Sequence, residues 1–333
     1  MTRKVSVLIC MVVTFLLCLS PVFAAEYRLR LQTYYSPSTA AGAKYFAEQV
    51  KKNTGGKVEV QVFTGGELIA SANILKSVKN GMIEMGQGMG HHFSELKTGT
   101  IESGLPMSWM STTEATLLYD ERGLRTLIGK EYEKAGVVYL GPTWAASYHT
   151  ASKQPIRSLD DMRKMKVRVV GATAKMLASL GINVVTMPPE DIYMALATGQ
   201  IDAVVYGNAA EYKETKFYEV APYINITPLI NPITDTLIIN KKIWDEMPSD
   251  IRVGIQAAAD QARWYWYSWG ENESLNVLAD IFKDKVTTFS EADQKELVKA
   301  AVAVWEQEAE KSPEAAKGVK ILKDFAQAIG RLE

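Results

Sequence analysis

One charged residue stands in a run of residues that otherwise predicts a buried strand. Residues 166–170 read KVRVV, and Arg168 lies in the middle of this β-branched run. Because an unpaired charge is costly to bury, the guanidinium needs an anionic partner. Two partners remain open from the residues alone. One is an Asp or Glu in a structural ion pair, and the other is the carboxylate of a ligand, which a guanidinium can match with two parallel hydrogen bonds.

Side chains for covalent or metal-assisted chemistry are scarce. The sequence contains no nucleophile elbow, no HEXXH motif and no His paired with Ser or Cys at a loop apex. The histidines are His91, His92 and His149. The adjacent pair is interpreted as solvated loop residues, because neighbouring side chains point apart, with contact to a ligand as the alternative. We expect no enzyme, no metal site and no cofactor, although the plentiful acids leave a carboxylate-based hydrolase as an alternative.

The segments around Arg168 follow a strand–helix–strand–helix–strand order. Gly181 and Gly199 end two short apolar segments, and Pro188 and Pro189 precede the second of them, as at a helix start. The predicted strands are 166–170, 183–187 and 200–206, and the predicted helices are 174–180 and 192–198. Such a βαβαβ unit forms a parallel sheet with right-handed crossovers, and its ligands bind beyond the carboxyl ends of the strands.

The N-terminal part of the chain predicts the same unit a second time. Its predicted strands are 27–33, 57–63 and 82–85, and its predicted helices are 39–54 and 70–80. A helix at 113–127 and a strand at 136–141 are expected to follow. Later in the chain, Ser249 or Asp250 is a good N-cap for a long helix that runs toward Leu278.

The sequence around Arg168 resembles one family of transport proteins. The motif K-x-R-V at 166–169, the run SLGINVVTMPPEDIYMALATGQIDAVVYG at 179–207 and KFYEVAPYI at 216–224 carry the resemblance. They are similar to the substrate-binding subunit of TRAP (tripartite ATP-independent periplasmic) transporters, the DctP-type family. The likeness extends from about residue 27 to residue 248, with a weaker helical tail. It implies that the arginine after K-x binds the carboxylate of an organic acid, and Arg168 is the only position that matches.

The resemblance and the repeated unit together predict an α/β fold with two lobes, like a type II periplasmic binding protein. Each lobe is expected to hold a mainly parallel sheet flanked by helices. The lobes are predicted at 26–150 plus 236–270 and at 151–235 plus 271–333, after a signal peptide at 1–25. Strands near 136–152 and 236–240 can each run between the lobes and form a hinge for closure. The long helix is expected to span both lobes.

Ligand contacts are expected from loops that follow the strands, in the cleft between the lobes. The expected ligand-binding residues are Arg168, Tyr206, Asn208, Tyr34, Tyr35, Glu67, Trp144, Tyr148, Asn231 and Asp235. By the resemblance, Tyr206 replaces an aromatic residue in a branch that binds 2-oxo acids. Val205 replaces a glutamate that holds a metal cation there, and valine cannot ligate a metal. Aromatic rings around one arginine favour a monocarboxylate with an apolar or aromatic body, and a 2-oxo acid is one candidate.

The first 25 residues are predicted to be a secretory signal peptide, which places the mature protein in the periplasm. Arg3 and Lys4 precede an apolar run that is too short to span a bilayer comfortably, and cleavage is expected after Ala24 or Ala25. Both cysteines lie in this leader, so the core must stabilise the mature chain without disulfides. Subtracting the two leader cations from 37 Lys and Arg, against 38 Asp and Glu, leaves a charge of −3. That charge argues against nucleic acid and anionic membranes as partners.

The expected partners are a small carboxylate ligand and the membrane permease subunits of a TRAP transporter. A periplasmic receptor for a chemotaxis or sensor protein is the alternative, since it would use the same ligand site. The aromatic run RWYWYSW at 263–269 cannot place all its rings on one side of a helix. Packing within a monomer is expected for these rings, and a dimer formed through residues 264–269 is the alternative.

Overall fold

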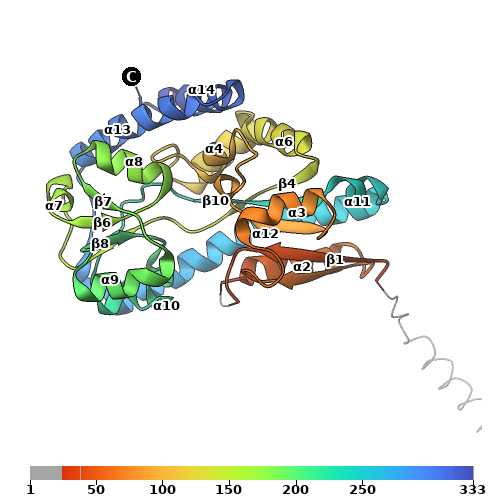
Figure 1. Ribbon diagram of the computed structural model, residues 1–333, viewed down its shortest axis with the longest axis horizontal. Coiled ribbons are helices and arrows are strands. Elements are labelled where there is room, and N and C mark those ends of the chain that lie inside the picture. The colour runs from red at the N-terminus through yellow and green to blue at the C-terminus, as the bar shows by residue number, and fades with distance from the viewer. Residues whose placement is uncertain (1–24, 38, 333) are drawn as a thin grey trace, which may run out of the picture.

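Two β-sheets, each flanked by helices, organise the computed structural model, which describes residues 25–37 and 39–332 (Figure 1). The predicted α/β fold with two lobes is confirmed. The predicted signal peptide lies outside the described residues, except for Ala25. Within the described part of the chain, no helix has both the length and the apolar character that a membrane span requires.

The first sheet has five strands in the order β2-β1-β3-β10-β4. Their bounds are β1 Tyr27–Thr33, β2 Val58–Phe63, β3 Met85–Gly88, β4 Val137–Trp144 and β10 Thr234–Asn240. Strand β1 is parallel to β2 and β3, whereas β10 is antiparallel to both β3 and β4. The third strand is predicted at 82–85, but β3 begins at Met85 and ends at Gly88. The loop that follows it therefore starts at residue 89.

The second sheet has six strands in the order β11-β9-β5-β8-β6-β7. Their bounds are β5 Thr150–Ser152, β6 Lys166–Arg168, β7 Asn183–Val185, β8 Ala203–Val205, β9 Tyr223–Asn225 and β11 Val286–Thr287. Strand β6 is parallel to β7 and β8. Strand β5 runs antiparallel between β8 and β9. Arg168 is the last residue of β6 and thus lies at the carboxyl end of a central strand.

Both predicted βαβαβ units are confirmed. The helices are α2 Ala41–Asn53, α3 Ile74–Lys79, α4 Gly99–Ser103, α5 Thr112–Thr116, α6 Leu124–Lys134, α7 Leu159–Arg163, α8 Gly171–Ser179, α9 Ile192–Thr198, α10 Ala209–Glu214, α11 Lys241–Glu246, α12 Ser249–Val277, α13 Glu291–Ala309 and α14 Pro313–Ala328. The first unit is β1-α2-β2-α3-β3 and the second is β6-α8-β7-α9-β8. Each unit places its first strand between the other two, so the two crevices at the strand ends have the same construction.

The single helix predicted at 113–127 is wrong. The segment divides into α5, a π-helical turn at Leu117–Glu121 and α6. Gly123 separates the last two with a φ of 85°, a left-handed conformation that glycine adopts without a Cβ clash. The interruption matters because the π-helical turn carries Asp120, which contacts the long helix.

The chain passes between the two sheets three times. Residues 145–149 connect β4 with β5, and residues 226–233 connect β9 with β10. The third connection is α12, which contacts α2 and β4 of the first lobe and α10 of the second (Figure 1). The predicted lobe-spanning helix is confirmed. Helix α14, which the predicted division assigns to the second lobe, contacts α4 and α6 beside the first sheet, whereas α13 packs on α8.

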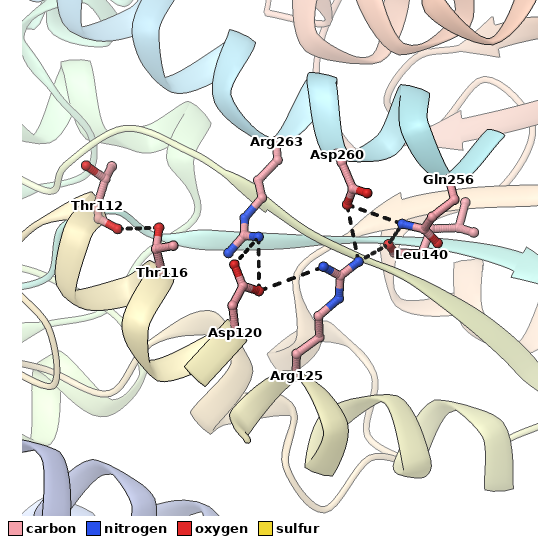
Figure 2. Close-up of polar contacts among 8 residues, drawn as sticks. All are labelled: Thr112, Thr116, Asp120, Arg125, Leu140, Gln256, Asp260 and Arg263. Atoms are coloured by element: carbon pink, nitrogen blue, oxygen red, sulfur yellow. Dashed lines mark hydrogen bonds and ion pairs between the residues drawn. The ribbon is translucent and has the colours of Figure 1, made fainter. Parts of the chain in front are cut away.

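A chain of charged residues fastens α12 to the first lobe (Figure 2). Arg263 is buried on α12 and pairs with Asp120 at 2.8 Å, and its guanidinium lies 4.3 Å from the ring centre of Trp144. Asp120 also lies 3.8 Å from Arg125, which pairs with Asp260 of α12 at 3.3 Å. These ion pairs hold the middle of α12 on the first lobe. The same helix also contributes side chains to the cavity between the lobes.

Candidate functional site

A cavity of about 560 Å³ opens between the two lobes. Its walls come from the segments that follow β1, β3, β6 and β8, from the connection after β4, and from α12. The cavity thus lies beyond the carboxyl ends of parallel strands from both sheets, where ligands bind in α/β folds. Of the residues predicted to bind a ligand, the structure places Arg168, Tyr34, Tyr35, Tyr148, Tyr206 and Asn208 on its surface.

Arg168 reaches the cavity from the end of β6, with 4% of its surface exposed. Nε and Nη2 donate to the carbonyl of Met187 at 3.2 and 2.9 Å, and Nη1 donates to the carbonyl of Val205 at 3.4 Å. Among the described residues, no Asp or Glu forms an ion pair with this guanidinium, and burial lowers its pKa. The guanidinium carbon lies 5.9 Å from the centre of the Tyr206 ring.

Two stacked tyrosines after β1 form part of the opposite wall. The rings of Tyr34 and Tyr35 lie 4.2 Å apart with an angle of 29° between them. Their hydroxyls donate to the two carboxylate oxygens of Asp235 at 2.8 and 2.6 Å. Asp235 is fully buried on β10, and burial raises its pKa to about 7. One carboxylate therefore fixes two cavity rings from behind without lining the cavity itself.

Helix α12 adds two tryptophans to the same wall. Trp266 lies 5.2 Å from the ring of Tyr35 and stacks on Trp269 at 5.0 Å. The two tryptophans are three residues apart on one helix face, and both line the cavity. Trp264 points elsewhere: 42% of its surface is exposed, and its ring meets Trp144 edge to face. Within the described chain the aromatic run therefore divides between the cavity and the first lobe.

Helix α10, which follows β8, supplies two acids to the cavity. Asn208 caps α10 in a capping box, in which its side chain accepts from the N–H of Glu211 and its own N–H donates to Oε2 of Glu211. Asn208 also donates to the carbonyl of Gly270 on α12, at 3.3 Å. Burial raises the pKa of Glu211 to about 7 and also raises that of Glu214, and both acids line the cavity.

Four residues predicted to bind a ligand lie away from the cavity surface. Asp235 lies behind the tyrosines. Glu67 is exposed and accepts from the N–H of Thr64, so it closes its own loop. Trp144 is fully buried against Arg263, and Asn231 stands in the second connection between the sheets, where its N–H donates to Trp109. A place after a strand or beside a crossing segment predicts these four residues, and such a place does not fix the direction of a side chain.

Several cavity residues were missed by sequence reasoning. These are Glu211, Glu214, Trp266, Trp269 and Met89. The N-x-x-E pattern at Asn208 is a capping-box signal directly after a predicted strand, and it could have indicated Glu211. His91 and His92 also line the cavity. Their position is compatible with the alternative that one of them contacts a ligand. Burial lowers the pKa of His91 to about 4 and lowers that of His92 as well.

The family assignment follows from a match that covers most of the chain. Residues 35–312 match the DctP family, described as bacterial extracellular solute-binding protein, family 7. The chain belongs to this family. Proteins of this family are receptors that bind a solute, and they are not enzymes. The alternative of a carboxylate-based hydrolase is therefore wrong.

One relative by sequence and one by structure illustrate the similarity. A monocarboxylate 2-oxoacid-binding periplasmic protein of a Nostoc species is 24% identical over 240 residues, which span 71% of this chain and 66% of that protein. The matched part is thus just under two thirds of the relative. A TRAP periplasmic solute-binding protein from Chromohalobacter salexigens, with bound (S)-(+)-2-amino-1-propanol, is 22% identical, with a TM-score of 0.80 over 92% of this chain and 97% of that one.

A second solved structure, from Colwellia psychrerythraea with bound calcium and pyruvate, is 23% identical, with a TM-score of 0.79 over 92% of this chain and 95% of that one. The cavity of the present family 7 protein fits a calcium ion poorly. Among the described residues, no group of three or more His, Cys, Asp and Glu side chains is placed to hold a metal ion. Val205 is apolar and buried, whereas Ca²⁺ takes roughly six to eight oxygen ligands.

Proposed function

We propose that this receptor binds a small organic acid, a monocarboxylate with an apolar or aromatic body, and that Arg168 holds its carboxylate in the cavity between the lobes. The observation that carries the proposal is a buried guanidinium at a cavity wall with no acidic partner among the described residues. A guanidinium has five N–H groups, and Arg168 uses three of them on backbone carbonyls. The remaining donors suit a carboxylate.

The rest of the lining supports an apolar or aromatic body for the ligand. Tyr34, Tyr35, Trp266 and Trp269 present flat rings toward the cavity, and such rings pack well against apolar groups. The 2-oxo acids are one class to test first. A Nostoc relative is named for them, and the Colwellia neighbour holds pyruvate.

A thermal-shift experiment tests the proposal on the mature chain. Pyruvate, 2-oxobutanoate, phenylpyruvate and benzoate are each titrated against the wild type, Arg168→Met and the surface control Arg157→Met. A ligand that binds only the native state raises the melting temperature with the logarithm of its concentration over Kd. We expect one of these acids to stabilise the wild type and the control, and not Arg168→Met, because losing one partner of a buried charge pair costs about 2–5 kcal/mol.

Two results would reject the proposal. Equal stabilisation of the wild type and Arg168→Met would mean that the carboxylate binds elsewhere. No stabilisation by any carboxylate would remove the basis for an organic acid.

Export and delivery belong to the same proposal. We infer that the leader is cleaved after Ala24 or Ala25 and that the mature receptor delivers its ligand to TRAP membrane permease subunits in the inner membrane. Mass spectrometry of the periplasmic fraction should find a chain that begins at Ala25 or Glu26. Uptake of the identified ligand should stop when the permease genes are deleted, whereas a receptor that serves only a sensor would leave uptake unchanged.

The oligomeric state stays a prediction. Within the described chain, Trp264 is the only exposed tryptophan at 264–269. Light scattering on the wild type and on Trp264→Ser distinguishes a monomer from a dimer that uses this segment.

A further inference from the structure

The cavity is lined by more acidic than basic side chains. Arg168 is the only Lys or Arg among its lining residues in the described chain, whereas Glu211 and Glu214 are its acids. Histidines do not restore the balance, because the lowered pKa values of His91 and His92 keep them neutral at pH 7. A simple monocarboxylate would pair with Arg168 and leave both glutamates without a cationic partner, whereas a cation beside them would favour their charged form.

The position of Glu211 is built into the local fold. The capping box ties one carboxylate oxygen to the N–H of Asn208 at 3.2 Å. Gly207 makes room for this carboxylate, since a Cβ at that position would clash with Oε2 of Glu211. Among the described residues, Glu211 has no ion pair, and the charged groups close to it are the acids Glu214 and Asp235. The carboxylate is therefore held at the cavity with no cation of this chain beside it.

Aromatic faces complete a surface that suits a cation. The stacked pair Tyr34 and Tyr35 continues into Trp266 and Trp269, with ring-centre separations of 4.2, 5.2 and 5.0 Å. The faces of such rings are electronegative and attract ammonium groups, most strongly in dry sites. Tyr148 lines the same cavity as Arg168 and Glu211.

We propose that the ligand of this cavity is a zwitterion, an organic acid that also carries a cationic nitrogen. Its carboxylate binds Arg168, and its nitrogen lies between Glu211 and the rings of the aromatic wall. The inference rests on the proposed function only for the contact between Arg168 and a carboxylate. It assigns Glu211 as the residue that selects the charge of the ligand body.

Charge isosteres test the assignment directly. Glycine betaine and 3,3-dimethylbutanoate have the same shape and differ only in N⁺ against C, and 4-trimethylammoniobutanoate and 5,5-dimethylhexanoate form a longer pair. Isothermal titration in the presence of a chelator measures Kd for the four probes. We expect at least one betaine to bind the wild type about tenfold more tightly than its carbon isostere.

Two variants distinguish a specific effect of Glu211 from an effect of the protein's net charge. Glu211→Gln keeps an acceptor for the N–H of Asn208, so the capping box can persist. Glu219→Gln removes one negative charge from the same lobe at an exposed residue that accepts from Tyr193. The preference for the betaine should fall to about threefold or less in Glu211→Gln and stay unchanged in Glu219→Gln. If Glu211→Gln does not fold, Glu214→Gln on the same cavity wall takes its place and should reduce the preference.

The outcomes distinguish this inference from the proposed function. Carbon isosteres that bind as well as the betaines, and lose binding in Arg168→Met, overturn the zwitterion and leave the carboxylate receptor intact. A betaine preference that survives in both glutamate variants overturns the role of the acids. If Ca²⁺ in place of the chelator strengthens the carbon isosteres and Glu211→Gln removes that gain, the acids serve a metal and the zwitterion is rejected. No binding by any probe or simple carboxylate rejects both proposals.

Discussion

The guanidinium of Arg168 donates twice to one backbone carbonyl, that of Met187, through Nε at 3.2 Å and Nη2 at 2.9 Å. This bifurcated contact fixes the plane of the fork before any ligand arrives. Met187 follows β7, so the neighbouring strand of the same sheet orients the arginine. The side chain is thus preorganised by the lobe that carries it, and little rotamer freedom remains to be lost on binding.

Arg168→Lys should therefore behave almost like a deletion. Lysine keeps the charge, but an ammonium lacks the planar fork and cannot reproduce both the carbonyl contacts and a two-point contact to a carboxylate. We expect the Kd of the best carboxylate ligand to rise at least about tenfold, measured by isothermal titration. An unchanged Kd would show that only the charge of Arg168 matters.

Asp235→Asn should weaken ligand binding through the two tyrosines. The amide retains one neutral acceptor oxygen, so one of the hydroxyls of Tyr34 and Tyr35 loses its acceptor and the other keeps a weaker one; a hydrogen bond to a charged group is worth about 1.5–3 kcal/mol. The expected result is a weaker Kd together with a lower melting temperature.

A double-mutant cycle with Tyr35→Phe checks this prediction. If Asp235 acts by positioning Tyr35, the two changes will be strongly non-additive in ligand Kd. Additive effects would show that Asp235 supports the fold without orienting the ring.

Asp120→Asn should destabilise the anchor of α12 much more than Asp260→Asn (Figure 2). Asp120 is the ion-pair partner of Arg263, whose side chain is only 7% exposed, and breaking a buried pair costs about 3–5 kcal/mol. Asp260 pairs with the more exposed Arg125, where a contribution of about 0–1 kcal/mol is typical. Urea unfolding of both variants measures this difference in the free energy of unfolding. Equal decreases in the two variants would contradict a larger contribution from the buried pair of Arg263 and Asp120.

Glu102 should make the protein less stable as pH rises. It is fully buried, Tyr132 donates to it at 2.7 Å, and burial raises its pKa from 4.5 to about 8. Between these values the folded state holds one more proton than the unfolded state. The free energy of unfolding therefore falls with pH, by up to about 1.4 kcal/mol per pH unit.

The isosteric variant Glu102→Gln isolates this contribution from Asp235 and Glu211, whose pKa values burial also raises. Urea unfolding at about pH 5 and pH 8 should give a smaller difference for Glu102→Gln than for the wild type. The same pH dependence in both proteins would mean that Glu102 is not the group that titrates.

Local sequence patterns determined the repeated unit and the place of Arg168. Apolar periodicity, glycine helix ends and the proline-led start before α9 act over a few residues, so they predicted both βαβαβ units and put an arginine at the end of a buried strand. Because ligands bind at the carboxyl ends of parallel strands, the same patterns placed Tyr34, Tyr35 and Tyr206 at the strand ends, where they line the cavity.

Tertiary structure decided which side chains face the cavity. Trp144 ends β4 and Tyr148 lies four residues later in the first connection, yet Trp144 packs on Arg263 inside the first lobe and Tyr148 lines the cavity. On α12, the rotation set by the contacts of Asp120 and Asp260 turns Trp266 toward the cavity and leaves Trp264 at the surface.

The acids show the same division between local and tertiary information. Glu67 and Glu211 both follow strands, but Glu67 caps its own loop, whereas the capping box turns Glu211 into the cavity. The sequence by itself thus determined the elements and the strand ends of this receptor. The direction of each side chain depends on packing between segments far apart in the chain, which no local pattern contains.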